Sequence, residues 1–367
     1  MKKATAPVKN SAPSENEIHL FAAANTFDGF VSFFDEAFCR DGMNKIYILK
    51  GGPGSGKSTI MKSYAENAVK QGNTPIYYHC SSDPSSLDGV TVKETGVSVV
   101  DGTSPHVFEP SYPGTRDFYV DLSPAWDTGL LEGCKDKIER LSGAKSECYK
   151  TAYRLLKAAG TVTNEMYECA KSFVDTVKIK GFVKRFARKY IKQGGAKQKE
   201  LKKIVVNAIS SKGLVRYFTP ENAANTLFFV KDAGLVSRFL FEELECEIKK
   251  SGADAVLALS PENPNEICAI LLKESGVCVS LYDEDMANKL EAQGKSIKII
   301  NASRFIDTEK YKSHRQKFRF AAKCRETLFD AALSELSAAG KFHEKLESVY
   351  ISATDYKKVE EIAGILY

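Results

Sequence analysis

The chain of 367 residues repeats itself at an almost constant offset. VKETGVSV at 92–99 corresponds to LKESGVCV at 272–279, a shift of 180 residues. An internal repeat fixes the unit of folding before any single motif is considered, so the sequence predicts two copies of one fold. Further segments pair at nearly the same shift: KIYILK (45–50) with TLFFVK (226–231), DLSPAWDT (121–128) with NASRFIDT (301–308), and AYRLLKAAG (152–160) with ALSELSAAG (332–340).

Each copy alternates short apolar strands with helices. In the first copy IYIL (46–49) leads through a loop into a helical pattern at 58–72, and in the second LFFV (227–230) leads into one at 235–252. Short buried strands that alternate with helices indicate a mostly parallel sheet covered on both faces. The predicted fold class is therefore α/β: two tandem three-layer domains with mostly parallel sheets and helical extensions.

Composition sets the expected domain boundaries. Residues 1–16 are polar and lack apolar positions, which predicts a flexible tail. We expect the first domain, with its helical extension, at 17–195 and the second at 201–367, joined through QGGAKQ at 193–198.

The overall composition is that of a soluble globular protein. Hydrophobic residues make up 43% and charged residues 27% of the chain. The nine cysteines are scattered without a CxxC pair, and no apolar run reaches the length of a membrane span or an export signal. We therefore expect a cytoplasmic protein with reduced thiols and no transmembrane segment.

The segment KGGPGSGKST at 50–59 matches the phosphate-binding pattern G-x-x-x-x-G-K-[ST] between a predicted strand and a predicted helix. Glycines let backbone N–H groups turn inward around phosphate oxygens, and the helix that begins near Lys57 adds its N-terminal dipole. Lys57 would bridge the β- and γ-phosphates, Ser58 would hold Mg²⁺ and Thr59 would touch the α-phosphate. The sequence thus predicts a P-loop NTPase domain that binds ATP and Mg²⁺, with these nucleotide-binding residues: Gly51, Gly52, Pro53, Gly54, Ser55, Gly56, Lys57, Ser58 and Thr59. ATP is favoured over GTP because no NKxD-type guanine signature is present.

A second metal ligand is expected at the end of a neighbouring strand. Asp101 closes the apolar run 97–100 and carries the charge that Mg²⁺ requires; the alternative is that it only opens a turn with Gly102. No glutamate follows Asp101, so the usual residue that activates water is missing. Because ligands bind beyond the carboxyl ends of strands in open α/β sheets, we place Asp83 and His106 in the site, whereas His79 and Cys80 have structural roles as alternatives.

The second copy lacks the residues that would bind MgATP. At the positions of Lys57, Ser58 and Asp101 it carries Arg238, Phe239 and Leu281. Phenylalanine cannot coordinate magnesium, so we expect a degenerate P-loop domain. Arg238 could instead neutralise charge on the γ-phosphate as an arginine finger. Arg116 is the competing donor, and a solvated helix residue is the alternative for Arg238.

The stretch 177–203 is strongly basic, with eleven Lys and Arg residues against the single acid Glu200. This local excess is larger than the net charge of +5 of the whole chain. The interpretation that we favour is a solvated helix face. Binding of nucleic acid or of a membrane surface is the alternative function class for this stretch.

Four segments resemble one known family. HLFAAANTFDGF (19–30), ILKGGPGSGKST (48–59), YYHCSSDPSSLDGV (77–90) and VVDGTSPHVFEP (99–110), in this order, are similar to a little-characterised family of bacterial P-loop ATP-binding proteins, best known from Firmicutes. The family has tandem P-loop domains, and the resemblance covers nearly the whole chain beyond the tail. It implies ATP binding and hydrolysis but no established substrate. Many members keep the motif in the second half, and this sequence departs from them there.

These observations lead to one expected function and one alternative. We expect a Mg²⁺-dependent ATPase with one active and one degenerate domain, in which hydrolysis moves the pair of domains and acts on an unidentified small-molecule or protein partner. The alternative is a P-loop kinase that transfers the γ-phosphate to a small molecule or a nucleotide. The missing glutamate and the Asp101-Gly102 pair favour the kinase. The duplication and the lack of an obvious lid favour the ATPase.

Overall fold

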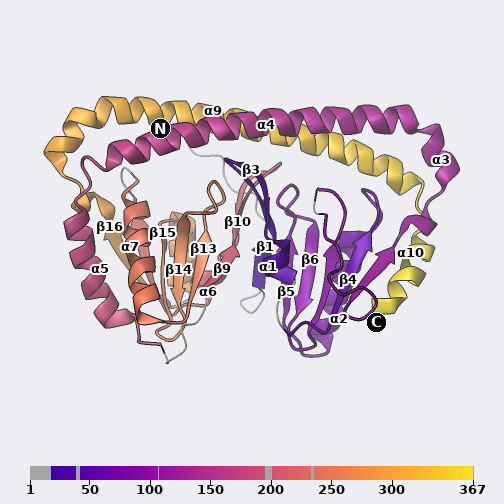
Figure 1. Cartoon of the computed structure of the whole chain (residues 1–367), viewed down its shortest axis with the longest axis horizontal. Coiled ribbons are helices and arrows are strands. Elements are labelled where there is room, and N and C mark those ends of the chain that lie inside the picture. The colour runs from indigo at the N-terminus through magenta and orange to yellow at the C-terminus, as the bar shows by residue number, and fades with distance from the viewer. Residues whose placement is uncertain (1–17, 39–41, 106, 195–200, 233–234, 367) are drawn as a thin grey trace. The chain divides into compact units, whose positions relative to one another are not determined.

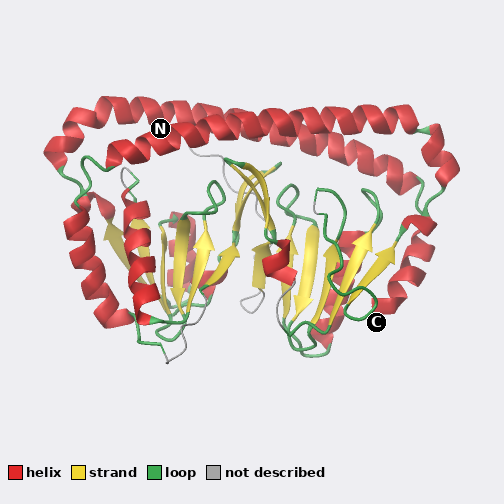
Figure 2. Cartoon of the chain, in the orientation of Figure 1, coloured by secondary structure: helices red, strands yellow, loops and turns green. Residues whose placement is uncertain are grey.

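The computed structural model describes residues 18–38, 42–105, 107–194, 201–232 and 235–366. The expected tail at 1–16 lies outside these residues. The protein is α/β, with long helices and twelve strands in mixed, mostly parallel β-sheet (Figure 2). Among the described residues, no helix combines the length and apolarity that crossing a bilayer requires.

The chain forms two compact units. Unit 1 contains residues 1–155, 207–217 and 330–367, and unit 2 contains residues 156–206 and 218–329. This division differs from the sequence expectation of 17–195 and 201–367. Two of the four boundaries fall inside long helices, α4 (Lys135–Ala170) and α9 (Thr308–Ser352), whose halves pack in different units. The other two boundaries lie on either side of the segment 207–217.

Unit 1 contains six strands of mixed sheet and two hairpins (Figure 1). The sheet order is β1 (Ile18–Phe21), β5 (Pro75–His79), β6 (Leu87–Val92), β7 (Val97–Asp101), β4 (Lys45–Lys50) and β8 (Asp117–Asp121). The pairs β1–β5, β7–β4 and β4–β8 are parallel, whereas β6 runs antiparallel to both of its neighbours. The antiparallel hairpins are β2 (Ala23–Thr26) with β3 (Gly29–Ser32), and β10 (Asn207–Ser210) with β11 (Gly213–Arg216).

Unit 2 repeats this strand order. Its order is β9 (Lys202–Val205), β13 (Ala255–Leu259), β14 (Ile267–Leu272), β15 (Val277–Leu281), β12 (Thr226–Lys231) and β16 (Ser296–Asn301). Here β14 is the strand that runs antiparallel to its neighbours. The same order and the same directions in both units are what an internal duplication predicts.

The remaining helices are divided between the units. Those of unit 1 are α1 (Phe34–Phe38), α2 (Lys57–Lys70), η1 (Ser123–Ala125), α3 (Thr128–Gly133), α10 (Tyr356–Ala363) and η3 (Gly364–Leu366). Those of unit 2 are α5 (Thr176–Tyr190), α6 (Thr219–Asn222), α7 (Val236–Ser251), α8 (Glu284–Ala292) and η2 (Ala302–Phe305). The predicted helices at 58–72 and 235–252 are therefore confirmed as α2 and α7.

Helix α2 is flanked by two glycines whose backbone is left-handed, a conformation that favours glycine. Gly56 precedes the helix with φ 87°, and Gly72 follows its end with φ 81°. Between them Ile60, Met61 and Ala65 are buried against the sheet. Because each buried aliphatic side chain contributes about 1.5–3 kcal/mol, this face fixes the helix axis and with it the loop that precedes the helix.

The last helix of each repeat packs in the unit of the other repeat. Helix α10 lies at the end of the chain, and its Val359 and Ala363 share the core of unit 1 with Met61. Helix α5 follows the first repeat, and its Val183 and Phe186 belong to the core of unit 2, where α5 packs beside α7 (Figure 1). Segments far along the chain thus complete each unit.

Candidate functional site

The predicted phosphate-binding loop lies between β4 and α2 in unit 1. Strand β4 ends at Lys50, the loop occupies 51–56, and α2 begins at Lys57. Gly54 and Gly56 adopt left-handed φ values of 68° and 87°. The Ser55 hydroxyl donates to the Gly52 carbonyl at 2.8 Å, which closes the turn. The backbone therefore has the conformation that lets successive N–H groups face an anion.

Lys57 is held at this loop. Its Nζ donates to the carbonyl oxygens of Gly51 at 2.7 Å and Gly52 at 2.8 Å, and it lies 3.7 Å from Asp101 Oδ2. Burial lowers the pKa of Lys57, while the charge of Asp101 acts in the opposite direction. The structure thus brings together the predicted lysine and the predicted metal acid in a site of low solvent access.

Ser58 and Asp101 present the oxygens that the sequence assigned to Mg²⁺. Ser58 Oγ accepts a hydrogen bond from the Leu87 N–H at 3.0 Å. Asp101 Oδ1 accepts from the Thr103 N–H at 2.9 Å and from the Thr103 hydroxyl. Among the described residues no group of three or more His, Cys, Asp or Glu could hold a metal. One hydroxyl and one carboxylate still fit Mg²⁺, because this ion usually keeps waters and binds substrate phosphates.

A buried carboxyl, Asp88, and a half-buried thiol, Cys80, lie close to each other in unit 1. Asp88, at 3% exposure, has its pKa raised to about 8 by burial and by the charge of Asp101. Burial and the charge of Asp88 raise the pKa of the Cys80 thiol well above its usual value. A thiol that stays protonated is a poor nucleophile, which agrees with the structural role expected for Cys80.

His79 lies in an aromatic stack at the end of β5. Its Nδ1–H donates to the Pro84 carbonyl at 2.8 Å, so its Nε2 accepts from His19 Nδ1, also at 2.8 Å. The Tyr217 ring stacks on it at 4.5 Å between centroids. Burial and the neighbouring His19 lower the pKa of His79 to about 3, so the imidazole is neutral. These contacts account for His79 as a structural residue.

The carboxylate of Asp83 is engaged by other side chains. Lys212 Nζ lies 2.7 Å from Oδ1, and the Ser85 hydroxyl lies 2.7 and 2.8 Å from the two oxygens. Burial alone would raise the pKa of Asp83, but these hydrogen bonds outweigh it and lower the pKa. The other predicted residue of these loops, His106, lies outside the described residues.

The end of α9 and the start of α10 cover the loop, which the sequence analysis did not predict. The Tyr356 hydroxyl donates to the Gly54 carbonyl at 2.7 Å, across 302 residues of chain. A Cβ atom on Gly54 would lie 2.8 Å from Ile351 Cγ1 and 3.0 Å from the Glu347 carbonyl oxygen. One on Gly52 would lie 3.0 Å from the Tyr350 ring. The loop glycines are therefore needed for this close approach as well as for their φ values.

Glu347 carries its carboxylate from α9 to this loop. Burial raises the pKa of Glu347 and so does the charge of Asp83, while Lys57 and the Gly54 N–H lower it. His343, one turn earlier, places Nε2 at 3.7 Å from Glu347 Oε1. Burial, and then the charge of Lys145, lowers the pKa of His343 to about 4. At neutral pH the imidazole is uncharged, so this approach is not an ion pair.

The corresponding loop of unit 2 has different chemistry. The Arg238 guanidinium lies 3.6 Å from the centroid of the Tyr167 ring, and it forms ion pairs with Glu242 at 3.2 Å and Glu266 at 2.9 Å. The Tyr167 hydroxyl donates to the Glu242 carboxylate at 3.0 Å. Arg238 is thus a partly buried cation that is held by side chains of its own unit.

Arg116, the other predicted finger, is also engaged. Its Nε and Nη2 contact the two carboxylate oxygens of Asp117 at 2.5 and 2.9 Å. Its guanidinium lies over the Tyr112 ring at 4.7 Å. Asp117 is 2% exposed, so this bidentate pair anchors the loop before β8.

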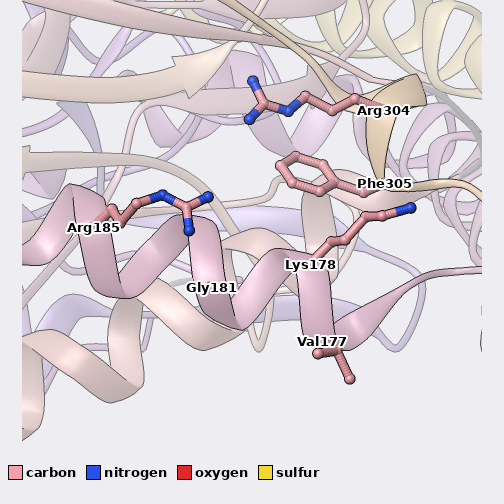
Figure 3. A pocket seen from close by; sticks show the side chains of 6 residues that line it. All are labelled: Val177, Lys178, Gly181, Arg185, Arg304 and Phe305. Atoms are coloured by element: carbon pink, nitrogen blue, oxygen red, sulfur yellow. The ribbon is translucent and has the colours of Figure 1, made fainter.

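Part of the basic stretch lies on the outer face of α5, Lys202 and Lys203 lie in β9, and residues 195–200 are outside the described residues. In α5 Ile179, Val183 and Phe186 are buried, whereas the four basic residues Lys184, Arg185, Arg188 and Lys189 are exposed. An open hollow of about 380 Å³ lies beside this helix, and Figure 3 shows the guanidinium groups of Arg185 and Arg304 near Phe305 while the Lys178 amine points away. The hollow is lined by Val177, Lys178, Gly181, Arg185, Arg304 and Phe305.

Comparison with known proteins adds no assignment for these two units. No family model, no curated protein and no solved structure matches the chain. The candidate site in unit 1 therefore rests on its own residues: the loop between β4 and α2, Lys57 with Asp101, and the cover supplied by α9 and α10.

Proposed function

We propose that unit 1 is a P-loop domain that binds ATP with Mg²⁺ and hydrolyses it. The observation that carries this proposal is Lys57, whose ammonium is held 2.7–2.8 Å from two loop carbonyls and 3.7 Å from Asp101. A cation in a glycine-rich turn at a helix N-terminus has the geometry and charge for the phosphates of a nucleotide.

Each residue of the site has a defined task in this proposal. The N–H groups of the loop at 51–56 bind the phosphate oxygens, and Lys57 exchanges its loop carbonyls for the β- and γ-phosphates. The Ser58 hydroxyl and the Asp101 carboxylate would hold Mg²⁺, which neutralises charge on the phosphates when it is bound. Tyr356 and Ile351 fix the loop from outside and limit the entry of water.

The residues of unit 2 do not suit a second nucleotide site, so the proposal is one site per chain. At the positions of Lys57 and Ser58 it has Arg238, whose guanidinium is engaged by Tyr167 and Glu266, and Phe239, which has no oxygen to offer. Hydrolysis in unit 1 would then serve a small-molecule or protein partner. A second candidate is a kinase, since Gly102 and not a glutamate follows Asp101.

Calorimetric titration of the full chain with ATP and Mg²⁺ tests this proposal. We expect one site per chain, and phosphate release that does not depend on an added acceptor. Two equivalent sites, or no binding, would contradict it. ATP consumption that appears only with one member of a panel of small-molecule acceptors would identify the kinase instead.

A further inference from the structure

We propose that Glu347 accepts the proton from the oxygen that attacks the γ-phosphate. The inference rests on the proposed function and adds the group that the first-unit strands do not supply. Glu347 lies on α9, in the part of the helix that belongs to unit 1.

Glu347 lies on a turn of α9 that contacts the phosphate-binding loop. The backbone carbonyl of Glu347 would be 3.0 Å from a Cβ atom on Gly54, so this turn of α9 lies directly on the phosphate-binding loop. The neighbouring turn places Tyr350 and Ile351 against Gly52 and Gly54. A carboxylate on this helix face is therefore next to the place where loop N–H groups would hold the terminal phosphates.

The charge of the Glu347 carboxylate is directed at groups of the loop. The Glu347 carboxylate interacts with Lys57 and the Gly54 N–H, the two loop groups that phosphate would also use. Burial raises the pKa of Glu347 above its ordinary value, which makes it a better proton acceptor than an exposed carboxylate. Neutral His343, at 3.7 Å, does not compensate its charge.

The other candidate acids in the described part of unit 1 are engaged elsewhere or closed to solvent. Asp101 is assigned to Mg²⁺ and is fixed by Thr103. Asp88 is buried at 3% exposure, so its carboxyl group is closed to an attacking oxygen from solvent. Asp83 is ion-paired with Lys212 at 2.7 Å. Glu347 is the remaining carboxylate whose charge acts on Lys57.

The internal repeat shows that the two units differ at the position of Glu347. The offset of 180 residues that pairs 152–160 with 332–340 places Tyr167 at the position of Glu347. In unit 2 Tyr167 stacks on Arg238, the residue at the position of Lys57. The unit without the lysine, the metal-binding hydroxyl and the metal acid therefore also lacks this carboxylate. In unit 2 the Tyr167 ring and the Arg238 guanidinium are in contact, and in unit 1 the charge of Glu347 acts on Lys57. Only unit 1 has chemistry suited to phosphoryl transfer.

The step conserves atoms and charge. The attacking oxygen, from water or from an acceptor hydroxyl, forms a bond to the γ-phosphorus, and its proton passes to a Glu347 carboxylate oxygen. The bond from the γ-phosphorus to the bridging oxygen breaks, and its electron pair stays on the β-phosphate of ADP. The proton then leaves Glu347 for solvent or for the released phosphate.

The test compares Glu347→Gln with the matched control Glu344→Gln, which changes an exposed acid one turn earlier on α9. Single-turnover hydrolysis of MgATP and calorimetric binding of MgADP are measured on the full chain. We expect Glu347→Gln to slow hydrolysis by about 10²–10³-fold, as general-base removal does, with MgADP affinity changed by less than about threefold. Glu344→Gln should retain the wild-type rate, and Glu347→Asp, which keeps a carboxylate, should be faster than Glu347→Gln.

The opposite results are distinguishable. A wild-type rate in Glu347→Gln would overturn the inference while leaving ATP binding by unit 1 intact. Tighter MgADP binding with a retained rate would show that the carboxylate only competes with phosphate for the loop, which also overturns it. Absence of nucleotide binding in the unaltered protein would overturn the proposed function and the inference with it.

Discussion

Lys57 of unit 1 and Arg238 of unit 2 occupy corresponding positions in two units of the same strand order. The surroundings of these two cations differ. Lys57 contacts backbone carbonyls of its own loop, and in the proposed function it exchanges them for phosphate oxygens. Arg238 is enclosed by the Tyr167 ring and by Glu242 and Glu266. A shared fold therefore preserves the position of the cation but not its availability, because function depends on the site and not on the fold.

The backbone shows the same contrast. Gly54, in the loop before α2, has φ 68°, and Leu235, at the corresponding position before α7, has φ 62°. A left-handed conformation costs a residue with a Cβ about 1–2 kcal/mol. The Leu235 side chain packs against the core of unit 2, which offsets this cost. The Leu235 side chain of unit 2 thus packs into the core of its own unit, whereas Gly54 of unit 1 is approached closely by Ile351 of α9.

Removal of each cation tests the comparison most directly. Lys57→Ala should reduce turnover of MgATP by about 10²–10³-fold, because a preorganised charge in a water-poor site is lost. Arg238→Ala should leave the single-turnover rate unchanged and destabilise unit 2 by about 1–3 kcal/mol, since Glu266 loses its cationic partner while the Asn263 amide stays. Rapid-quench kinetics and urea unfolding of both variants provide the check. A large rate loss in Arg238→Ala with unchanged ATP affinity would instead make Arg238 a finger.

Acid should affect unit 1 through a residue that unit 2 lacks. His79 ends β5, whereas Leu259 ends the corresponding strand β13. The folded pKa of His79 is about 3 and its ordinary value is 6.5, so the unfolded chain binds more protons between these values. The resulting stability is fully present above about pH 6.5 and is lost as the pH falls towards 3. We expect a loss on the order of 2–4 kcal/mol over this window.

Urea unfolding between pH 7.5 and pH 4 measures this loss. His79→Leu should flatten the dependence of unfolding free energy on pH, although it lowers stability at neutral pH because the Pro84 carbonyl loses its donor. His314→Gln, at the start of α9 in unit 2, is the control. An unchanged slope in His79→Leu would contradict the assignment.

The smallest effect is expected at the basic face of α5. Its counterpart α10 carries Glu360 and Glu361, so the two helices differ in charge although both pack on a sheet. Exchange of the four exposed cations Lys184, Arg185, Arg188 and Lys189 for Glu should leave the ATPase rate within about twofold, because these side chains face solvent. We also expect no binding of RNA or DNA oligonucleotides by the unaltered chain. A submicromolar complex that weakens steeply with salt would contradict this expectation.

Local patterns in the sequence predicted much of the fold. The strand 46–49, the glycine-rich loop and the helix that follows were predictable because a strand, a turn and a helix N-terminus each depend on adjacent residues. The antiparallel strand β6 was missed, because LDGVTV contains Asp88 and Gly89 and resembles the turn that precedes it. Gly89 is required there since a Cβ atom would lie 2.3 Å from the Phe38 ring.

The site was predictable only in its local half. Lys57, Ser58 and Asp101 follow from a motif and a strand end, whereas Glu347 and Tyr356 reach the loop because helices at the far end of the chain pack in unit 1. No spacing rule near the loop contains that information. The one available signal was the internal repeat. An offset of 180 residues pairs Glu347 with Tyr167 and Asp101 with Leu281, and an offset of 181 pairs Lys57 with Arg238.

The placement of α10 in unit 1 also has a consequence for biosynthesis. A ribosome completes the strands and the glycine-rich loop of the first repeat long before it adds Glu347 and Tyr356. Throughout that interval the nascent loop lacks the hydroxyl that contacts Gly54 and the carboxylate whose charge acts on Lys57. The order of translation therefore delays completion of the candidate site until the carboxyl-terminal helices emerge, and a chain that stops early is released without it.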